Sequence, residues 1–234
     1  AGPALLSQAG IYLVAMFLSL SLRTEPSHRA KLRLGSTLSG LAAGARYVKG
    51  EPMILSLMVI GGIPSILVLP FVHGLMPVYA AEVFDVGAPG LGLLLAAIGA
   101  GSAIGSIGLA SLGDIHRTGR IIIGSLVLVA VSMVLFSQAR SYGLAVPAVM
   151  ILSVGIGAFW TTTTATIQSM ASDEFRGRVA GLYMLTWGVF PVGSLIAGGL
   201  ADRLGPELAT LMAVGGLGVV LVVVALRFRR IWWF

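Results

Sequence analysis

The feature that most constrains this chain is a series of seven long apolar stretches, each about as long as a bilayer crossing. They lie near residues 5–22, 53–80, 90–112, 121–138, 144–168, 179–199 and 207–226. A membrane-spanning helix needs about 20 apolar residues. The chain is 57% hydrophobic and 10% charged, whereas a soluble domain has about 25% charged residues. The sequence therefore predicts an all-α polytopic membrane protein with about seven transmembrane helices in a lipid bilayer.

The basic residues fall almost entirely on one side of these stretches. If the stretches cross the bilayer in alternation, the gaps on one side hold only Arg140 and Arg203. The gaps on the other side hold Arg23, Arg29, Lys31, Arg33, Arg46, Lys49, Arg117, Arg120, Arg176, Arg178, Arg227, Arg229 and Arg230. This asymmetry places the segment 23–50 and the C-terminus in the cytoplasm. Because the charge is spread over short loops, the expected partner is the anionic lipid headgroup and not nucleic acid.

The residue types needed for metal or thiol chemistry are absent or scattered. The chain has no cysteine, and His28, His73 and His116 show no metal-ligand spacing. No nucleophile accompanies Asp114 and His116 in their loop. We therefore expect neither a metal nor a cofactor, and we do not expect an enzyme.

Two stretches at opposite ends of the chain resemble each other. Residues 2–23 and 205–227 both open with Gly-Pro-x-Leu, continue as an apolar span and end in Leu-Arg. This pattern predicts that 1–22 is the last transmembrane helix of a preceding half. Residues 23–50 then form a cytoplasmic linker, and 51–234 form a half with six transmembrane helices. Because the chain opens with Ala-Gly-Pro and no initiator methionine, we expect a piece of a longer protein whose N-terminal six-helix half is missing.

The predicted linker contains an amphipathic helix. Leu34, Leu38, Leu41, Ala45 and Val48 recur on one helical stripe, with basic residues around the rest of the helix. Such a helix either lies along the inner leaflet or bridges two spans in solvent.

Small residues in one span predict close helix packing, and glycines and prolines in another predict a bend. Ala97, Gly101 and Gly105 recur at four-residue spacing, which favours close packing of helices in lipid. The span near 53–80 is interrupted by Gly61, Gly62, Pro64, Pro70, Gly74 and Pro77. Because proline removes a helical hydrogen bond, a bend is expected there, serving either function or packing.

Polar and aromatic side chains within the spans are the candidates for lining an internal pathway, because polar groups are costly in lipid. Helical spacing selects His73, Tyr79, Trp160, Thr161, Thr164, Gln168, Tyr183, Thr186 and Trp187. The threonine hydroxyls have an alternative role, bonding to their own helix backbone, and His73 has one as a neutral, helix-bonded residue. No Asp, Glu, Lys or Arg lies in the middle of a span, so the pathway favours an apolar or amphipathic molecule.

Two short cytoplasmic loops, 112–120 and 171–178, place acids beside arginines at helix ends. The candidate gate residues are Asp114, Arg117, Gly119, Arg120, Asp173, Glu174, Arg176, Gly177 and Arg178. Acids of one loop that pair with arginines of the other form a charge latch. The alternative is a pair of solvated turns, whose exposed ion pairs contribute about 0–1 kcal/mol.

These loops carry a resemblance to a known family. The GDxxRxGR stretch at 113–120 resembles the cytoplasmic loop signature of the major facilitator superfamily. DEFRGRVAGLY at 173–183 and PVGSLIAGGLADRLGP at 191–206 resemble its efflux branch, which includes macrolide-efflux and enterobactin-exporter-like proteins. The resemblance implies the C-terminal half of such a carrier in a bacterial inner membrane.

The function implied by the resemblance is secondary active transport. Two halves rock around a midplane site by alternating access and export a small amphipathic substrate. The alternative is a non-transporting membrane subunit, derived from a truncated carrier, that packs in a larger membrane complex.

Overall fold

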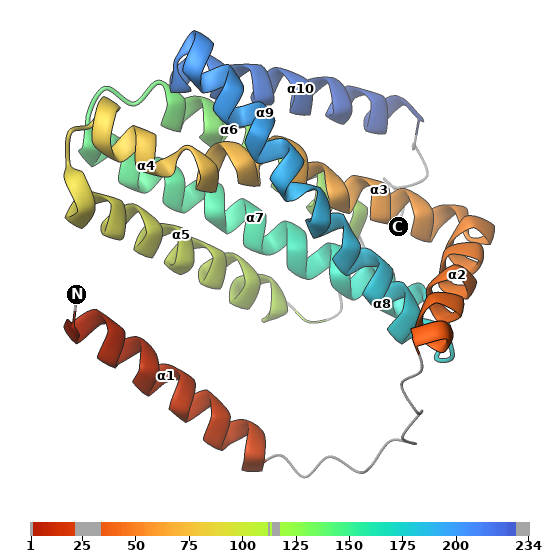
Figure 1. Ribbon diagram of the computed structural model, residues 1–234. Coiled ribbons are helices and arrows are strands. Elements are labelled where there is room, and N and C mark those ends of the chain that lie inside the picture. Colours follow the sequence, from red (N-terminus) through yellow and green to blue (C-terminus); the bar gives the residue numbers. More distant parts are fainter. Residues whose placement is uncertain (1, 22–33, 112, 114–117, 228–234) are drawn as a thin grey trace. The chain divides into compact units, whose positions relative to one another are not determined.

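The computed structural model describes residues 2–21, 34–111, 113 and 118–227 (Figure 1). Within these residues every regular element is helical, and six helical segments are long and apolar enough to cross a membrane. The six are Pro52–Val83, Gly87–Ala110, Thr118–Ser137, Tyr142–Met170, Arg176–Leu204 and Pro206–Val224. The prediction of an all-α, multi-span membrane protein is therefore confirmed.

The chain divides into two units, residues 1–38 and 39–234. The first contains α1 (Gly2–Ser21), an apolar helix of 20 residues that corresponds to the first predicted stretch. In its second half, Tyr12, Phe17 and Leu20 are exposed. The second unit begins within α2 (Leu34–Gly50) and holds all six long segments.

The first long segment is a broken helix. It consists of α3 (Pro52–Leu67), the π-helical turn η1 (Pro70–Gly74), the short α4 (Met76–Val78) and a second π-helical turn, η2 (Tyr79–Val83). Pro70 lacks the N–H that the Ile66 carbonyl would accept in a regular helix. The Ile66 carbonyl lies against Gly193 of α9, where only a glycine leaves room for it. The proline-rich stretch thus forms a helical segment with altered backbone geometry in its C-terminal part.

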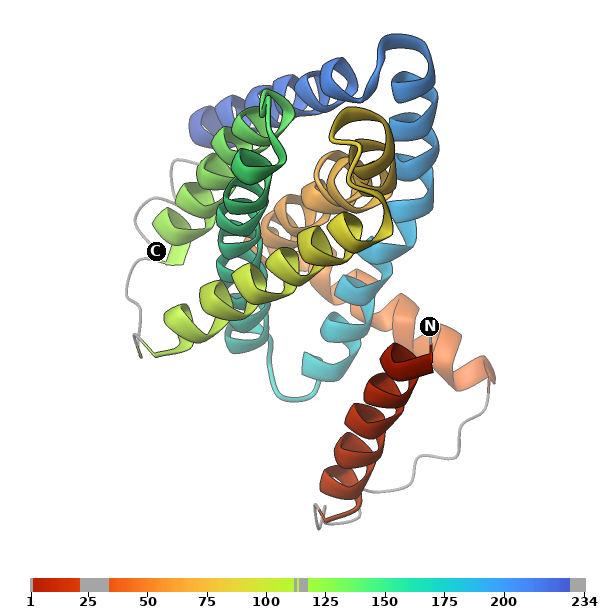
Figure 2. The same ribbon diagram turned by 90° about the vertical axis from the view of Figure 1, so that its left-hand side faces the viewer.

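The tightest contact in the second unit joins α5 (Gly87–Ala110) to α7 (Tyr142–Met170). A Cβ added at Gly101 or Gly105 would overlap the backbone carbonyl of Met150 or Val154, and one at Gly157 would overlap that of Ser102. Backbones approach this closely only where side chains are missing. On its other side α7 packs against α6 (Thr118–Ser137), where Gly155 meets Val129 (Figure 2).

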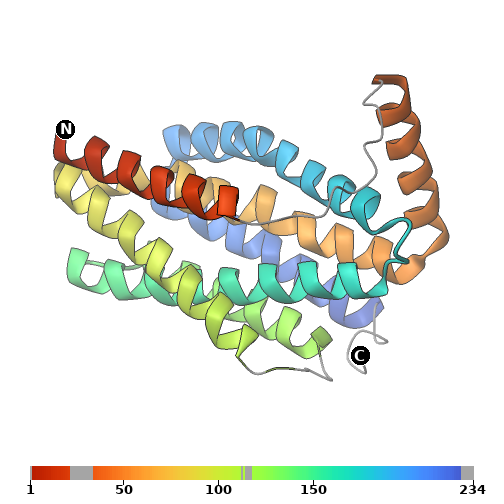
Figure 3. The same cartoon turned by 90° about the horizontal axis from the view of Figure 1, so that it is seen from below.

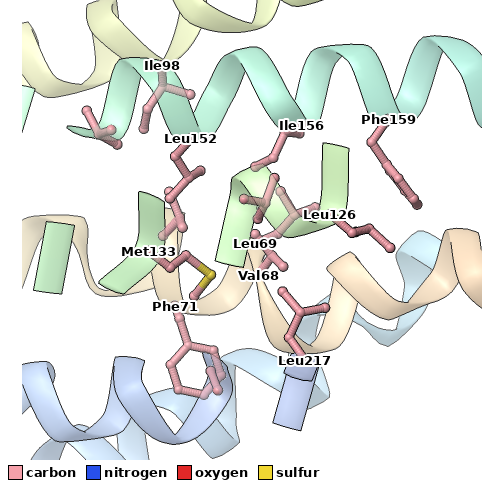
Figure 4. Packing of buried hydrophobic residues seen from close by; sticks show 14 of the residues in the cluster. Val68, Leu69, Phe71, Ile98, Leu126, Met133, Leu152, Ile156, Phe159 and Leu217 are labelled. Atoms are coloured by element: carbon pink, nitrogen blue, oxygen red, sulfur yellow. The ribbon is translucent and has the colours of Figure 1, made fainter. Parts of the chain in front are cut away.

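The remaining helices pack around α5, α6 and α7. The fifth long segment consists of α8 (Arg176–Leu185), the 3-10 turn η3 (Thr186–Val189) and α9 (Phe190–Leu204). The last helix, α10 (Pro206–Arg227), packs against α6 and α9. Phe71 of η1, Met133 of α6, Leu152 of α7 and Leu217 of α10 meet in the buried interior with Val68, the residue that follows α3 (Figure 4).

The amphipathic helix of the predicted linker is present as α2, but its buried face differs from the predicted stripe. Ala45 is exposed, whereas Gly44 and Val48 are buried and Leu41 is half-buried. The reason is steric: α2 approaches α8 through Gly44, where an added Cβ would lie 3.1 Å from Arg178 Cβ. The buried face of α2 therefore includes Gly44 beside Leu41 and Val48 of the stripe, and leaves Ala45 outside it.

The α5–α7 contact predicts a difference between two glycines on α5. Replacing Gly105 with Ala should destabilise the protein by about 1–3 kcal/mol, because the methyl group must displace the Val154 carbonyl. Replacing Gly108, which has no atom within 4 Å of an added Cβ, should be neutral or stabilising because alanine is the better helix former. The melting temperatures of the two variants are measured in detergent, with size-exclusion chromatography monitoring the loss of folded protein on heating. Equal melting temperatures would contradict the packing described here.

Candidate functional site

A cavity of about 770 Å³ opens beside α7. Four of the long segments contribute to its wall: the broken first segment, α5, α7 and the α8–η3–α9 segment. Its polar lining groups are His73, Ser102, Ser106, Thr164 and Gln168, and the other lining residues are apolar or aromatic. No Asp, Glu, Lys or Arg is among the lining residues in the described part of the chain. The cavity therefore offers a large uncharged surface with a few hydrogen-bonding groups.

The structure brings six of the nine predicted pathway residues together in this cavity. They are His73, Trp160, Thr164, Gln168, Tyr183 and Trp187. Thr161 lies at a second, more open hollow of about 440 Å³ that shares Trp160, Thr164 and Gln168 with the first. Tyr79 and Thr186 line neither hollow.

Tyr79 and Thr186 have other partners. Tyr79 is fully buried, and its hydroxyl oxygen lies 3.0 Å from the Pro206 carbonyl and 2.9 Å from Thr210 Oγ1. It thereby joins the broken span to the start of α10. The Thr186 hydroxyl donates to the Tyr183 carbonyl at 2.7 Å, within its own helical segment. This is the backbone-bonding role that the sequence left open for the threonines.

An aromatic cluster forms one wall of the cavity. The Trp160 ring lies 4.8 Å from that of Trp187 and 5.7 Å from that of Tyr183, measured between centroids. Trp187 is 49% exposed, whereas Tyr183 is buried. Trp187 is therefore the member of the cluster with the most surface free to contact a molecule in the cavity.

The position of Trp187 follows from Pro191. In a regular helix the N–H of residue 191 would donate to the Trp187 carbonyl, and proline has no N–H. The Phe190 N–H donates to that carbonyl instead, which tightens residues 186–189 into the 3-10 turn η3. This local change separates α8 from α9 at the level of the cavity.

Tyr183 is held by close contact with α3. A Cβ added at Gly61 would lie 2.5 Å from Tyr183 Cε2, so the ring rests directly on the helix backbone. The Tyr183 hydroxyl is buried and has no hydrogen bond of normal geometry, although it interacts with the Thr164 side chain.

The predicted gate residues are only partly described. Asp114 and Arg117 lie outside the described residues, and Gly119 and Arg120 belong to the first turn of α6. Glu174 is exposed, and Gly177 and Arg178 belong to the first turn of α8. Asp173 and Arg176 form an ion pair of 2.7 Å. Both side chains are at least half exposed, so the pair contributes little stability.

Arg176 has a second contact that matters more for geometry. Its Nε donates to the Gln168 carbonyl at 3.1 Å. This carbonyl belongs to the last turn of α7, where backbone acceptors lack helical partners. The arginine therefore caps α7 and links the turn 171–175 to a residue of the cavity wall.

Some lining residues were missed by the sequence reasoning. Ser102 and Ser106 line the cavity from α5, one residue after Gly101 and Gly105. Their four-residue spacing was a usable signal, because it puts them on one side of the helix beside the glycine contact.

Six apolar helical segments in the described part of the chain, four of which line the cavity, define a multi-pass membrane protein. Residues 3–192 match the description Major Facilitator Superfamily, and this chain belongs to that family of membrane transporters. The family assignment made from the two loop sequences is thus confirmed, and it places the chain in the cell membrane. Members of this family are in general transporters, not enzymes.

A relative supports the efflux branch. The chain is 26% identical over 197 residues to a protein described as "Multidrug efflux pump Tap" from Mycolicibacterium fortuitum. The alignment covers 84% of this chain and 47% of the relative. The chain thus spans about half the length of the curated relative that it matches.

The contact between Tyr183 and α3 predicts that two neighbouring glycines differ. Gly61→Ala should cost about 1–3 kcal/mol of stability because its methyl group meets the Tyr183 ring. Gly62→Ala should be tolerated, since its Cβ would lie 3.7 Å from the nearest atoms. In a Tyr183→Leu background, which lacks the ring, the loss of unfolding free energy caused by Gly61→Ala should be smaller by about 1 kcal/mol. A double-mutant cycle of thermal stabilities measures this difference. Strict additivity of the two changes would contradict the contact.

Proposed function

We propose that this chain is the C-terminal half of an exporter that moves an amphipathic small molecule by alternating access. The observation that carries the proposal is the cavity wall, which combines aromatic rings in close contact with isolated hydroxyl and amide groups and, among the described residues, no formal charge. Such a surface binds the apolar body of a molecule by area burial and orients its polar groups with a few hydrogen bonds.

Each part of the wall has a distinct role in this proposal. Trp160 and Trp187 stack on the apolar or aromatic part of the substrate. Thr164, Gln168 and His73 bind its polar groups. Because the described residues of the wall include no Asp, Glu, Lys or Arg, a charged substrate would be buried without a partner charge, which is costly. An uncharged substrate avoids this cost.

The domain organisation belongs to the same proposal. Residues 1–22 are the last transmembrane helix of an N-terminal half, 23–50 are a cytoplasmic linker, and 51–234 are the C-terminal six-helix half. The resemblance between 2–23 and 205–227 supports it, as does the coverage of about half of the relative. A second six-helix half completes the cavity, and the two halves rock around it.

The orientation and the gate follow from the charge distribution. The concentration of arginine and lysine in alternate loops supports a cytoplasmic linker and C-terminus in a bacterial inner membrane. Asp114, Arg117 and Arg120 of one loop and Asp173, Glu174 and Arg178 of the other then face the cytoplasm. Their charges form a latch whose pairing changes as the halves rock.

Trp187 provides the test of this proposal. In cells expressing the full-length protein, Trp187→Ala should raise the KM for export of the planar, uncharged dye Nile red about threefold to tenfold, the value of a lost aromatic contact. Export of the dye is measured by its fluorescence after energisation of preloaded cells. Leu195→Ala is the matched control, because Leu195 is 78% exposed on α9 and does not line the cavity.

Two results would contradict the proposal. One is an unchanged KM in Trp187→Ala with normal amounts of protein in the membrane. The other is equal accumulation of Nile red in cells with and without the protein.

A further inference from the structure

The helix α2 is attached to the turn between α7 and α8 by one aromatic pair. The ring of Tyr47 on α2 stacks on the ring of Phe175, with centroids 4.5 Å apart and planes 3° from parallel. The Tyr47 hydroxyl oxygen also accepts the backbone N–H of Ser172 at 3.2 Å. Figure 3 shows α2 at a steep angle to α3, next to the place where α3 begins and beside the start of α8.

Two further contacts reinforce this attachment. The Arg178 guanidinium lies over the Phe175 ring, 5.0 Å from its centroid, in the range of a cation–π interaction. One turn before Tyr47 on α2, Gly44 allows the helix to approach Arg178 Cβ and Leu182 Cδ1. Phe175 is thus an aromatic residue in a polar turn whose ring is covered by residues from α2 and α8.

The turn held in this way connects two walls of the cavity. Gln168, in the last turn of α7, and Ala180, in the first turns of α8, both line the cavity. Between them, the backbone N–H of Ser172 bonds to Tyr47, and Arg176 bonds to the Gln168 carbonyl. The Phe175 and Arg176 N–H groups both donate to the Ser172 carbonyl. Tyr47 contacts this turn through Ser172 and Phe175. The turn determines the distance between the C-terminal end of α7 and the N-terminal end of α8, so Tyr47 helps to fix that distance.

We infer that Tyr47 and Phe175 are positioning residues for transport, which fix the ends of α7 and α8 at the side of the cavity predicted to face the cytoplasm. The inference rests on the proposed function, since it assigns the stack a role in moving substrate through that cavity. Neither residue touches the cavity, so their effect is on the geometry and motion of its walls and not on substrate contacts.

The first measurement follows opening of the turn in the full-length protein. The chain has no native cysteine, so Val179→Cys places a single thiol within it at a site that is 1% exposed in the first turn of α8. Tyr47→Leu keeps apolar bulk over the turn but removes the stack and the hydroxyl. It should speed maleimide labelling of the introduced thiol about twofold to tenfold, as expected for loss of an aromatic pair. Phe175→Leu, which removes the same stack from the other side, should give the same increase.

Two control variants distinguish the stack from general disturbance. Tyr47→Phe keeps the ring and should restore labelling close to the parent rate. Arg46→Ala changes the preceding, exposed residue of α2 and should leave labelling unchanged. Unchanged labelling in both Tyr47→Leu and Phe175→Leu would overturn the inference.

The second measurement is Nile red export by the same variants with Val179 retained. Tyr47→Leu should lower the maximal rate about twofold to tenfold and change KM by less than about twofold, because no substrate contact is lost. If labelling is faster but export is normal, the stack stabilises the turn without a role in transport, and the inference is overturned. A parent protein that exports nothing would instead overturn the proposed function, so the two failures are distinguishable.

Discussion

The close approach of the α5 and α7 backbones is the constraint on which the rest of the structure depends. In lipid, apolar side chains gain little by leaving one apolar environment for another, so helices associate by packing and not by the hydrophobic effect. Gly101, Gly105 and Gly157 supply this packing by leaving out the side chains that would hold the backbones apart. With α6 on its other side, α7 lies between two helices, and its Trp160, Thr164 and Gln168 form one wall of the cavity.

The chemistry of the cavity follows from two departures from regular helix that face this wall. The 3-10 turn that Pro191 imposes places Trp187 against Trp160. The π-helical turn after Pro70 carries His73 into the lining. Irregular backbone at membrane depth is tolerated where it lines a cavity, and both segments do so here. The result is an uncharged, aromatic surface with a few polar groups, suited to molecules with a large apolar part.

The sequence predicted the spans well because their length and hydropathy are set by the bilayer and not by tertiary contacts. Helical spacing grouped Thr161, Thr164 and Gln168 with the adjacent Trp160 on one helix, and Tyr183, Thr186 and Trp187 on another. The structure places Trp160, Thr164, Gln168, Tyr183 and Trp187 at the cavity, whereas Thr161 and Thr186 do not line it. The sequence did not predict the anchoring of Tyr79 to Pro206 and Thr210, or the burial of Gly44 in place of Ala45. Both depend on which helices become neighbours, and residue spacing within one helix carries no information about that.

The most direct test of the account asks whether an exported compound contacts the Trp160–Trp187 pair. In a full-length variant whose tryptophans other than Trp160 and Trp187 are replaced by phenylalanine, intrinsic fluorescence is recorded while the compound is titrated. The account predicts a saturable change in emission, with half-saturation near the KM for export, because a molecule in the cavity stacks on these rings. Active export with emission that stays constant through that concentration range would contradict it.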